Sequence, residues 1–305
     1  MVTLQEAMNF FGLRTQVVDF IRQFGVSVTL VLAAVFFPAT AYSAVFDWPT
    51  TPAWTGNSPA IGASETVNYA GDGVAVTLMN TGATWDTGNG GPYPTVVPGG
   101  TGFLNNGGTQ NALIIRALSQ TSNATYVRVT IDFSSVAYPL GVKNVSFQLW
   151  DIDSSVTGGN NFIDKISNIQ AIAVGGGTVY PDTVNNTHTS NAGTQYSIIS
   201  GSGASLAVAG DPLVGGAANN TDQGQVNIGF SQTIRSITFQ WSNGADPSNG
   251  GLGLLQHTVG IGSISFTPVP EVGSATGALA MCGGVLAIGR ARRRRMECAM
   301  VALHS

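Results

Sequence analysis

Short segments in which apolar and polar residues alternate constrain this chain more than any other feature. In the segment TYVRVTIDF, residues 125–133, the apolar positions are Val127, Val129, Ile131 and Phe133. The positions between them carry Arg128, Thr130 and Asp132. A period of two places these sets on opposite faces of a β-strand, one toward a core and one toward solvent. Such half-buried strands are typical of antiparallel sheets.

Comparable segments recur along the chain and predict further strands. They are NVSFQLWDID (144–153), SITFQW (236–241), GVAVTLM (73–79), ALIIRAL (112–118), ISNIQAIAV (166–174), QVNIGF (225–230) and HTVGIGSISF (257–266). In the last of these the inward set shifts from Val259 and Ile261 to Ile264 and Phe266. This change of parity predicts a β-bulge near Gly262.

The connections between these segments are rich in turn-forming residues, and the chain has 40 glycines among 305 residues. Between Ala44 and Pro268 we find no convincing long amphipathic helix. Short strands joined by such turns predict an all-β body, an antiparallel β-sandwich or jelly roll, over residues 45–267. The polar run Pro181–Gly224 is either a long excursion or a few edge strands.

The charges are divided unevenly between this body and its ends. Between Ala44 and Glu271 there are five basic and thirteen acidic residues, which gives a net charge of −8. An acidic body does not neutralise phosphates, so we expect no nucleic-acid partner. Both cysteines, Cys282 and Cys298, follow the body, which therefore has neither a disulfide nor a cysteine–metal site.

The N-terminal segment predicts export. The apolar run VSVTLVLAAVFF, residues 26–37, follows Arg14 and Arg22 and precedes the small-residue stretch ATAYSA. A charged flank, a short apolar run and a small-residue site are the parts of a secretory signal peptide. We predict a signal helix in residues 1–43, cleaved after Ser43. The alternatives are a buried helix and an uncleaved anchor.

The C-terminal segment predicts a membrane helix. Residues 272–288 carry no charge and would span ~26 Å as a helix, close to the lower limit for a bilayer. The arginines that follow are Arg290, Arg292, Arg293, Arg294 and Arg295. Arginines favour the cytoplasmic side, so they would stop transfer and leave residues 296–305 as a cytoplasmic tail. The alternative is an amphipathic core helix, but residues 278–288 lack the regular polar positions that it requires.

The order PVPEV, apolar segment, RARRRR resembles a PEP-CTERM sorting signal. The resemblance covers residues 268–295, and the motif maps to Pro270 and Glu271, with Val272 in place of the usual second proline. It implies a bacterial envelope protein that a membrane-embedded exosortase processes near Pro270–Glu271. The implied partners are this enzyme and membrane lipid. The implied location is first the membrane and then the cell surface or extracellular matrix.

Three aspartates form a candidate calcium site. Asp151 and Asp153 close the strand in LWDID and share one face if the strand continues, and Asp164 follows the next turn. Hard oxygen ligands at the end of a strand suit Ca²⁺, the one cofactor that the sequence indicates. The alternative is that these aspartates cap turns and shield sheet edges.

Trp150 is the candidate glycan-binding residue. It points away from Leu149 and Phe147, which predicts a place on the outer face, where an exposed indole could stack on a sugar ring. The alternative is that a second sheet or a loop covers this face.

Signals for catalysis are poor. The body has two histidines, His188 and His257, far apart in the sequence, and none of the motifs HExxH, GxSxG or GxxxxGK[ST]. We therefore predict a non-catalytic exported surface or matrix protein associated with exopolysaccharide, with no catalytic residue. The alternatives are a lectin-like module that binds carbohydrate or calcium, and a hydrolase.

Overall fold

The computed structural model describes residues 42–86, 93–98, 111–118, 125–155, 162–186, 196–214, 224–244 and 256–270. Within them the chain forms seventeen strands and two short 3-10 helices, η1 (Ala70–Asp72) and η2 (Gly203–Ser205). Every strand pairing among them is antiparallel. The prediction of an all-β, antiparallel body is confirmed.

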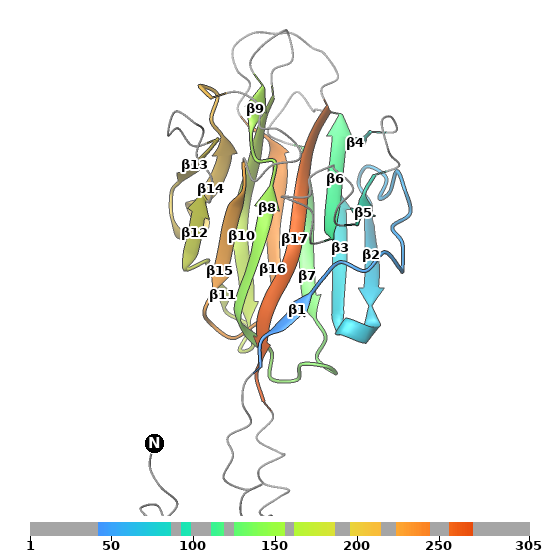
Figure 1. The fold of residues 1–305 in the computed structure, drawn as a ribbon, viewed down its shortest axis with the longest axis vertical. Coiled ribbons are helices and arrows are strands. Elements are labelled where there is room, and N and C mark those ends of the chain that lie inside the picture. The colour runs from blue at the N-terminus through green and yellow to red at the C-terminus, as the bar shows by residue number, and fades with distance from the viewer. Residues whose placement is uncertain are drawn as a thin grey trace, which may run out of the picture. The chain divides into compact units, whose positions relative to one another are not determined.

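The strands form two facing layers (Figure 1). Layer one has the order β12 (Thr183–Asn186), β15 (Val226–Phe230), β8 (Val142–Trp150), β17 (Gln256–Pro268) and β6 (Ala112–Leu118). Beside them, β1 (Ala44–Phe46) pairs with β17, while β4 (Thr84–Trp85) and β5 (Thr95–Val97) pair with β6.

Layer two has the order β13 (Ser197–Ser200), β14 (Ala207–Gly210), β10 (Phe162–Ala173), β16 (Ile234–Asn243), β7 (Tyr126–Phe133), β3 (Val74–Asn80) and β2 (Ser64–Tyr69). Two short strands, β9 (Ser154–Ser155) and β11 (Thr178–Val179), pair with β10. A single pair, Ile234 with Val142, joins β16 to β8, so the two layers are parts of one curled sheet.

The core lies between the layers, where the alternation of the strands places apolar side chains. In β7 the side chains predicted to face inward are buried and those predicted to face outward are not. β3 shows the same alternation of buried and partly exposed residues. Phe147 of layer one stacks on Phe239 of layer two with 5.9 Å between the ring centroids, and Phe133 meets Phe266 edge-on at 5.2 Å. These rings join the layers by burial of apolar area, the dominant favourable term in folding.

Two finer predictions concern β17 and the run after Pro181. The register of β17 against β8 shifts between Ile261 and Ile264, which confirms a bulge near Gly262. Within residues 181–224, the described part contains three short strands, β12, β13 and β14. Two of them are edge strands, β12 of layer one and β13 of layer two, in agreement with the second of the two predicted alternatives.

The first and last strands of the body are neighbours. β1 begins at Ala44 and pairs with the C-terminal half of β17, with Ala44 opposite Phe266. Residues 41–269 form one compact unit. The residues of the predicted signal helix before Tyr42, the predicted membrane helix 272–288 and the tail 296–305 lie outside the described residues. Among the described residues, no helix is long and apolar enough to cross a membrane.

Candidate functional site

Buried polar groups gather where β10 begins and where β8 and β16 end. Asp164 of β10 is fully buried, and its Oδ1 accepts a hydrogen bond of 2.9 Å from Nε1 of Trp241 on β16. The same Oδ1 lies 2.9 Å from Nδ1 of His257 on β17. The ring centroids of Trp241 and His257 are 4.4 Å apart. The three residues therefore tie the two layers together through one carboxyl group.

The structure places Asp151 and Asp153 differently from the sequence prediction. β8 ends at Trp150, and Asp151 has a φ of 64°, so the strand does not continue through the aspartates. The condition under which the two residues would share a strand face is therefore not met. Both residues are nevertheless buried, and the Asp153 carbonyl accepts a hydrogen bond of 2.8 Å from the Asp164 amide.

The protonation of this cluster follows from its burial. Burial raises the pKa of Asp151 well above its usual value, the charges of Asp153 and Asp164 raise it further, and Arg116 opposes them. Burial also raises the pKa of Asp164 well above its usual value, against the hydrogen bond from Trp241. Arg116 forms a buried ion pair of 2.8 Å with Asp86. The three aspartates are thus close enough to influence one another's charge.

Calcium binding stays a prediction. Oδ1 of Asp151 is buried and has no hydrogen-bond partner among the described residues, which leaves an oxygen available to a ligand. However, the described ranges contain no three His, Cys, Asp or Glu side chains arranged to hold a metal ion. Asn160 and Asn161, which the sequence places near this turn, lie outside the described residues.

The pair of His257 and Asp164 predicts a measurable pH dependence. Burial lowers the pKa of His257 to about 3 from its ordinary value of 6.5. As the pH falls, His257 is therefore protonated in the unfolded chain before it is protonated in the folded chain. The stability due to neutral His257 is complete above pH 6.5 and is lost as the pH falls toward 3. Over that window the free energy of unfolding should fall by up to about 1.4 kcal/mol per pH unit on this account.

The matched variant is His257→Asn, whose amide N–H can still donate to Asp164. Because asparagine does not titrate, we expect the free energy of unfolding of this variant not to show the fall that His257 causes between pH 6.5 and 4.5. The opposite slope that Asp164 contributes should be present in both proteins and cancel in the comparison. Urea titrations followed by tryptophan fluorescence measure it, because all five tryptophans lie between residues 48 and 241. Parallel pH profiles of the two proteins would contradict the burial of a neutral histidine.

Trp150 is buried rather than exposed, so the prediction of a surface tryptophan is wrong. The side chain does point away from the main core, but it is only 1% exposed and packs with Tyr93, Ala112 and Ile114. Gly260 and Gly262 of β17 leave room for the indole: a methyl group built on Gly262 would lie 2.9 Å from the ring. A ring enclosed in this way is not accessible to a sugar.

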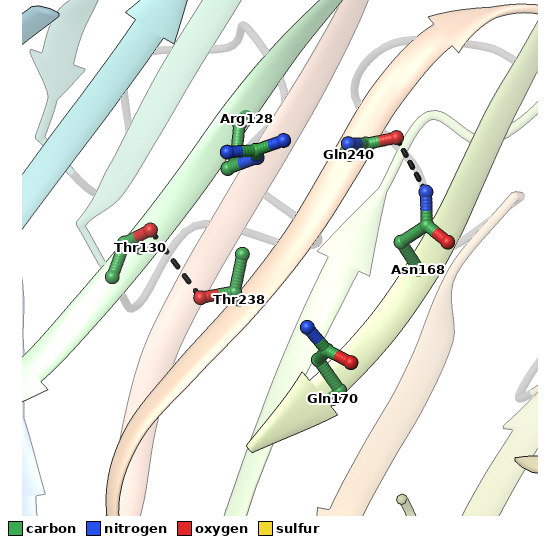
Figure 2. A pocket seen from close by; sticks show the side chains of 6 residues that line it. All are labelled: Arg128, Thr130, Asn168, Gln170, Thr238 and Gln240. Carbon is green, nitrogen blue, oxygen red and sulfur yellow. Dashed lines mark hydrogen bonds between the residues drawn. The ribbon is translucent and has the colours of Figure 1, made fainter. Parts of the chain in front are cut away.

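A second candidate site is a polar hollow on the outer face of layer two (Figure 2). Its volume is about 430 Å³, within the range of 300–1,000 Å³ usual for ligand sites. It is lined by Arg128 and Thr130 of β7, Thr238 and Gln240 of β16, and Asn168 and Gln170 of β10. We call these six residues the polar hollow. The alternation in residues 125–133 predicts that Arg128 and Thr130 face outward, as they do here, but it does not predict the hollow.

The hollow depends on a β-bulge in β10. Ser167 pairs with Gln240 and Gln170 pairs with Thr238, so two residues of β10 lie opposite one residue of β16. Asn168, at this bulge, has a φ of 51° and donates a hydrogen bond of 2.6 Å to Oε1 of Gln240. Bulges commonly re-aim a side chain in this way. The signal in the sequence is an asparagine, a residue that tolerates a left-handed backbone, inside a strand-like run.

Pro270 is the one residue of the predicted processing motif that the structure describes, and it is exposed. Glu271 and the stop-transfer residues Arg290, Arg292, Arg293, Arg294 and Arg295 lie outside the described residues. The predictions for them remain untested.

No protein-family model and no curated protein matches this chain. Among solved structures, it is similar to the K1 cleaved adhesin domain of Lys-gingipain from Porphyromonas gingivalis W83, at 8% identity and a TM-score of 0.31, over 75% of this chain and 99% of that one. It is also similar to the K2 cleaved adhesin domain of Lys-gingipain, at 14% identity and a TM-score of 0.27, over 73% of this chain and 98% of that one. At such scores the likeness supports no argument about function.

Proposed function

We propose that this chain is a non-catalytic, exported bacterial protein, sorted through its PEP-CTERM-like signal to the cell surface or extracellular matrix and associated there with exopolysaccharide. The observation that carries the proposal is the order of three elements at the C-terminal end, Pro270–Glu271, the uncharged segment 272–288 and the arginines 290–295, in a chain that begins with a signal-like segment. The uncharged segment would hold the chain in the membrane, the arginines would stop its transfer, and Pro270–Glu271 would mark the place of processing.

The arrangement of the body supports this proposal. The predicted signal-peptide cleavage after Ser43 falls directly before β1, which begins at Ala44. The predicted exosortase motif falls directly after β17, which ends at Pro268. Both cleavages would therefore cut outside the strands, and removal of the two terminal segments would leave every described strand of the body intact.

The proposal is tested by expressing the full chain in two bacterial strains that differ only in a functional exosortase gene. With the enzyme, we expect a surface or matrix product that has lost the segment after Pro270–Glu271. Without it, the product should be heavier by that segment and should stay in the membrane. A double variant, Pro270→Ala with Glu271→Ala, should behave in the first strain as the wild type does in the second. An unchanged full-length product in both strains would refute the sorting proposal.

A further inference from the structure

We propose that the polar hollow is the surface through which this protein binds polysaccharide, and that its ligand is an acidic chain that carries carboxylate groups, such as a uronic-acid polymer. This inference rests on the proposed association with exopolysaccharide and assigns it a place and a ligand class. Three features of the molecule support it: the side chains that line the hollow, their order across the sheet and the surroundings of Arg128.

The lining matches the chemistry of sugars. Five of the six side chains are hydroxyls or amides, and a sixth is a guanidinium. Threonine hydroxyls and the amides of Asn168 and Gln240 can both donate and accept hydrogen bonds, as sugar hydroxyls do. Figure 2 shows that these side chains belong to three neighbouring strands, with a hydrogen bond between Thr130 and Thr238 and another between Asn168 and Gln240. The lining is therefore suited to a ligand with many neutral hydroxyl groups.

The hollow belongs to a longer row of hydroxyl groups. Thr66, Thr77, Thr130 and Thr238 lie directly opposite one another on β2, β3, β7 and β16, and Gln170 of β10 continues the row. Thr66 and Thr77 share a hydrogen bond of 2.8 Å, and Thr130 and Thr238 one of 3.3 Å. Neighbouring strands lie ~4.8 Å apart, so this row repeats one contact at even spacing. A repeating surface of this kind suits a polymer better than a single small molecule.

Arg128 adds a charge that a neutral polymer does not need. Nη2 donates to the hydroxyl of Tyr126 at 3.1 Å, Nη1 lies 3.8 Å from Sδ of Met79, and the guanidinium lies over the Tyr126 ring. No salt bridge joins Arg128 to a carboxylate of the described residues. Because a guanidinium has five donors in a planar fork, it can still bind a carboxylate through two parallel hydrogen bonds.

The position of Arg128 fixes where an acidic group would lie. Gln240 is directly opposite on β16 and continues the polar lining toward Asn168. Asp132, the acidic residue on the same face of β7, is four residues away, or ~13 Å along the strand. A ligand carboxylate at Arg128 would thus be well separated from the protein carboxylate, although the body as a whole is acidic.

The test measures binding of the full chain, in detergent, to polygalacturonate and to neutral dextran. The wild type should bind polygalacturonate in preference to dextran. Arg128→Gln should weaken this binding by about tenfold, and the double variant Thr130→Val with Thr238→Val should weaken it as well. The matched control is Lys143→Gln, which removes a cation from β8 in layer one and should change binding by less than twofold. Unchanged thermal unfolding of each variant confirms that the fold is intact.

Four results would overturn the inference. They are binding to neither polymer, equal binding of the two polymers, wild-type affinity in Arg128→Gln, and binding that disappears with EDTA but does not respond to Arg128. The last result would favour a metal-dependent site and would make the calcium prediction for Asp151, Asp153 and Asp164 the next one to test. If the chain binds neither polymer but exosortase still processes it, the surface assignment fails and the sorting proposal stands. If the chain binds polygalacturonate but exosortase does not process it, the surface assignment stands and the sorting proposal fails.

Discussion

Replacement of Gly210 by alanine should lower the free energy of unfolding by about 3 kcal/mol, the upper end of the usual cost of overpacking. Gly210 ends β14, and a methyl group built on it would fall on the carbonyl of Asp153 and the amide of Ser154, well inside contact distance. These are backbone atoms and have no rotamer to change. The Ser154 hydroxyl also donates to the Asp211 carbonyl at 2.8 Å, so the two segments are held together and cannot separate without losing this bond.

The control for this prediction is Gly71→Ala. Gly71 lies in the exposed 3-10 helix η1, its backbone is not left-handed, and no atom lies within 4 Å of the position of its added methyl group. We expect this variant to stay within about 0.5 kcal/mol of the wild type. Urea unfolding of the full chain, followed by tryptophan fluorescence, compares the two. Equal stability of the two variants would show that the loop at Asp153 does not pack against β14.

The strands could be predicted from the sequence because alternation is a local signal. The segment 125–133 shows which side chains face inward, and the parity change in 257–266 shows where a bulge must absorb an extra residue. Alternation says nothing about which strands are neighbours. Thr130 and Thr238 are 108 residues apart, and their hydrogen bond depends on the pairing of β7 with β16. The polar hollow could therefore not be assembled from the sequence.

The surroundings of the residues at the end of β8 could not be predicted from alternation. The orientation of Trp150 away from Leu149 is a correct consequence of alternation, but its burial depends on Tyr93 and Ala112, which belong to distant segments. Alternation also leaves open whether the strand continues through the aspartates after Trp150, and in the structure it ends there, with Asp151 in a left-handed backbone. The contact of Asp164 with His257 likewise joins residues 93 positions apart. Local patterns predict the face of a side chain but not what covers it.

Trp48→Ala should lower the free energy of unfolding of the body by about 4 kcal/mol. The indole is fully buried, meets Phe46 and Tyr69 edge-on at 5.0 and 6.1 Å, and donates through Nε1 to the Gly262 carbonyl at 2.9 Å. Trp48→Phe should retain much of the packing and lose about 1–2 kcal/mol, because the buried carbonyl at the β17 bulge loses its donor.

The neighbouring change Val45→Ala is the control for Trp48, since Val45 lies in β1 but is 59% exposed. We expect it to cost less than about 0.5 kcal/mol in the same urea titration. The contrast bears on export, because Trp48 follows the predicted cleavage site after Ser43 by only five residues. A large effect at Trp48 with none at Val45 would mean that the mature chain must retain its first residues to fold. A small effect at Trp48 would mean that its side chain contributes little to the core, and that cleavage further along the chain is compatible with a folded body.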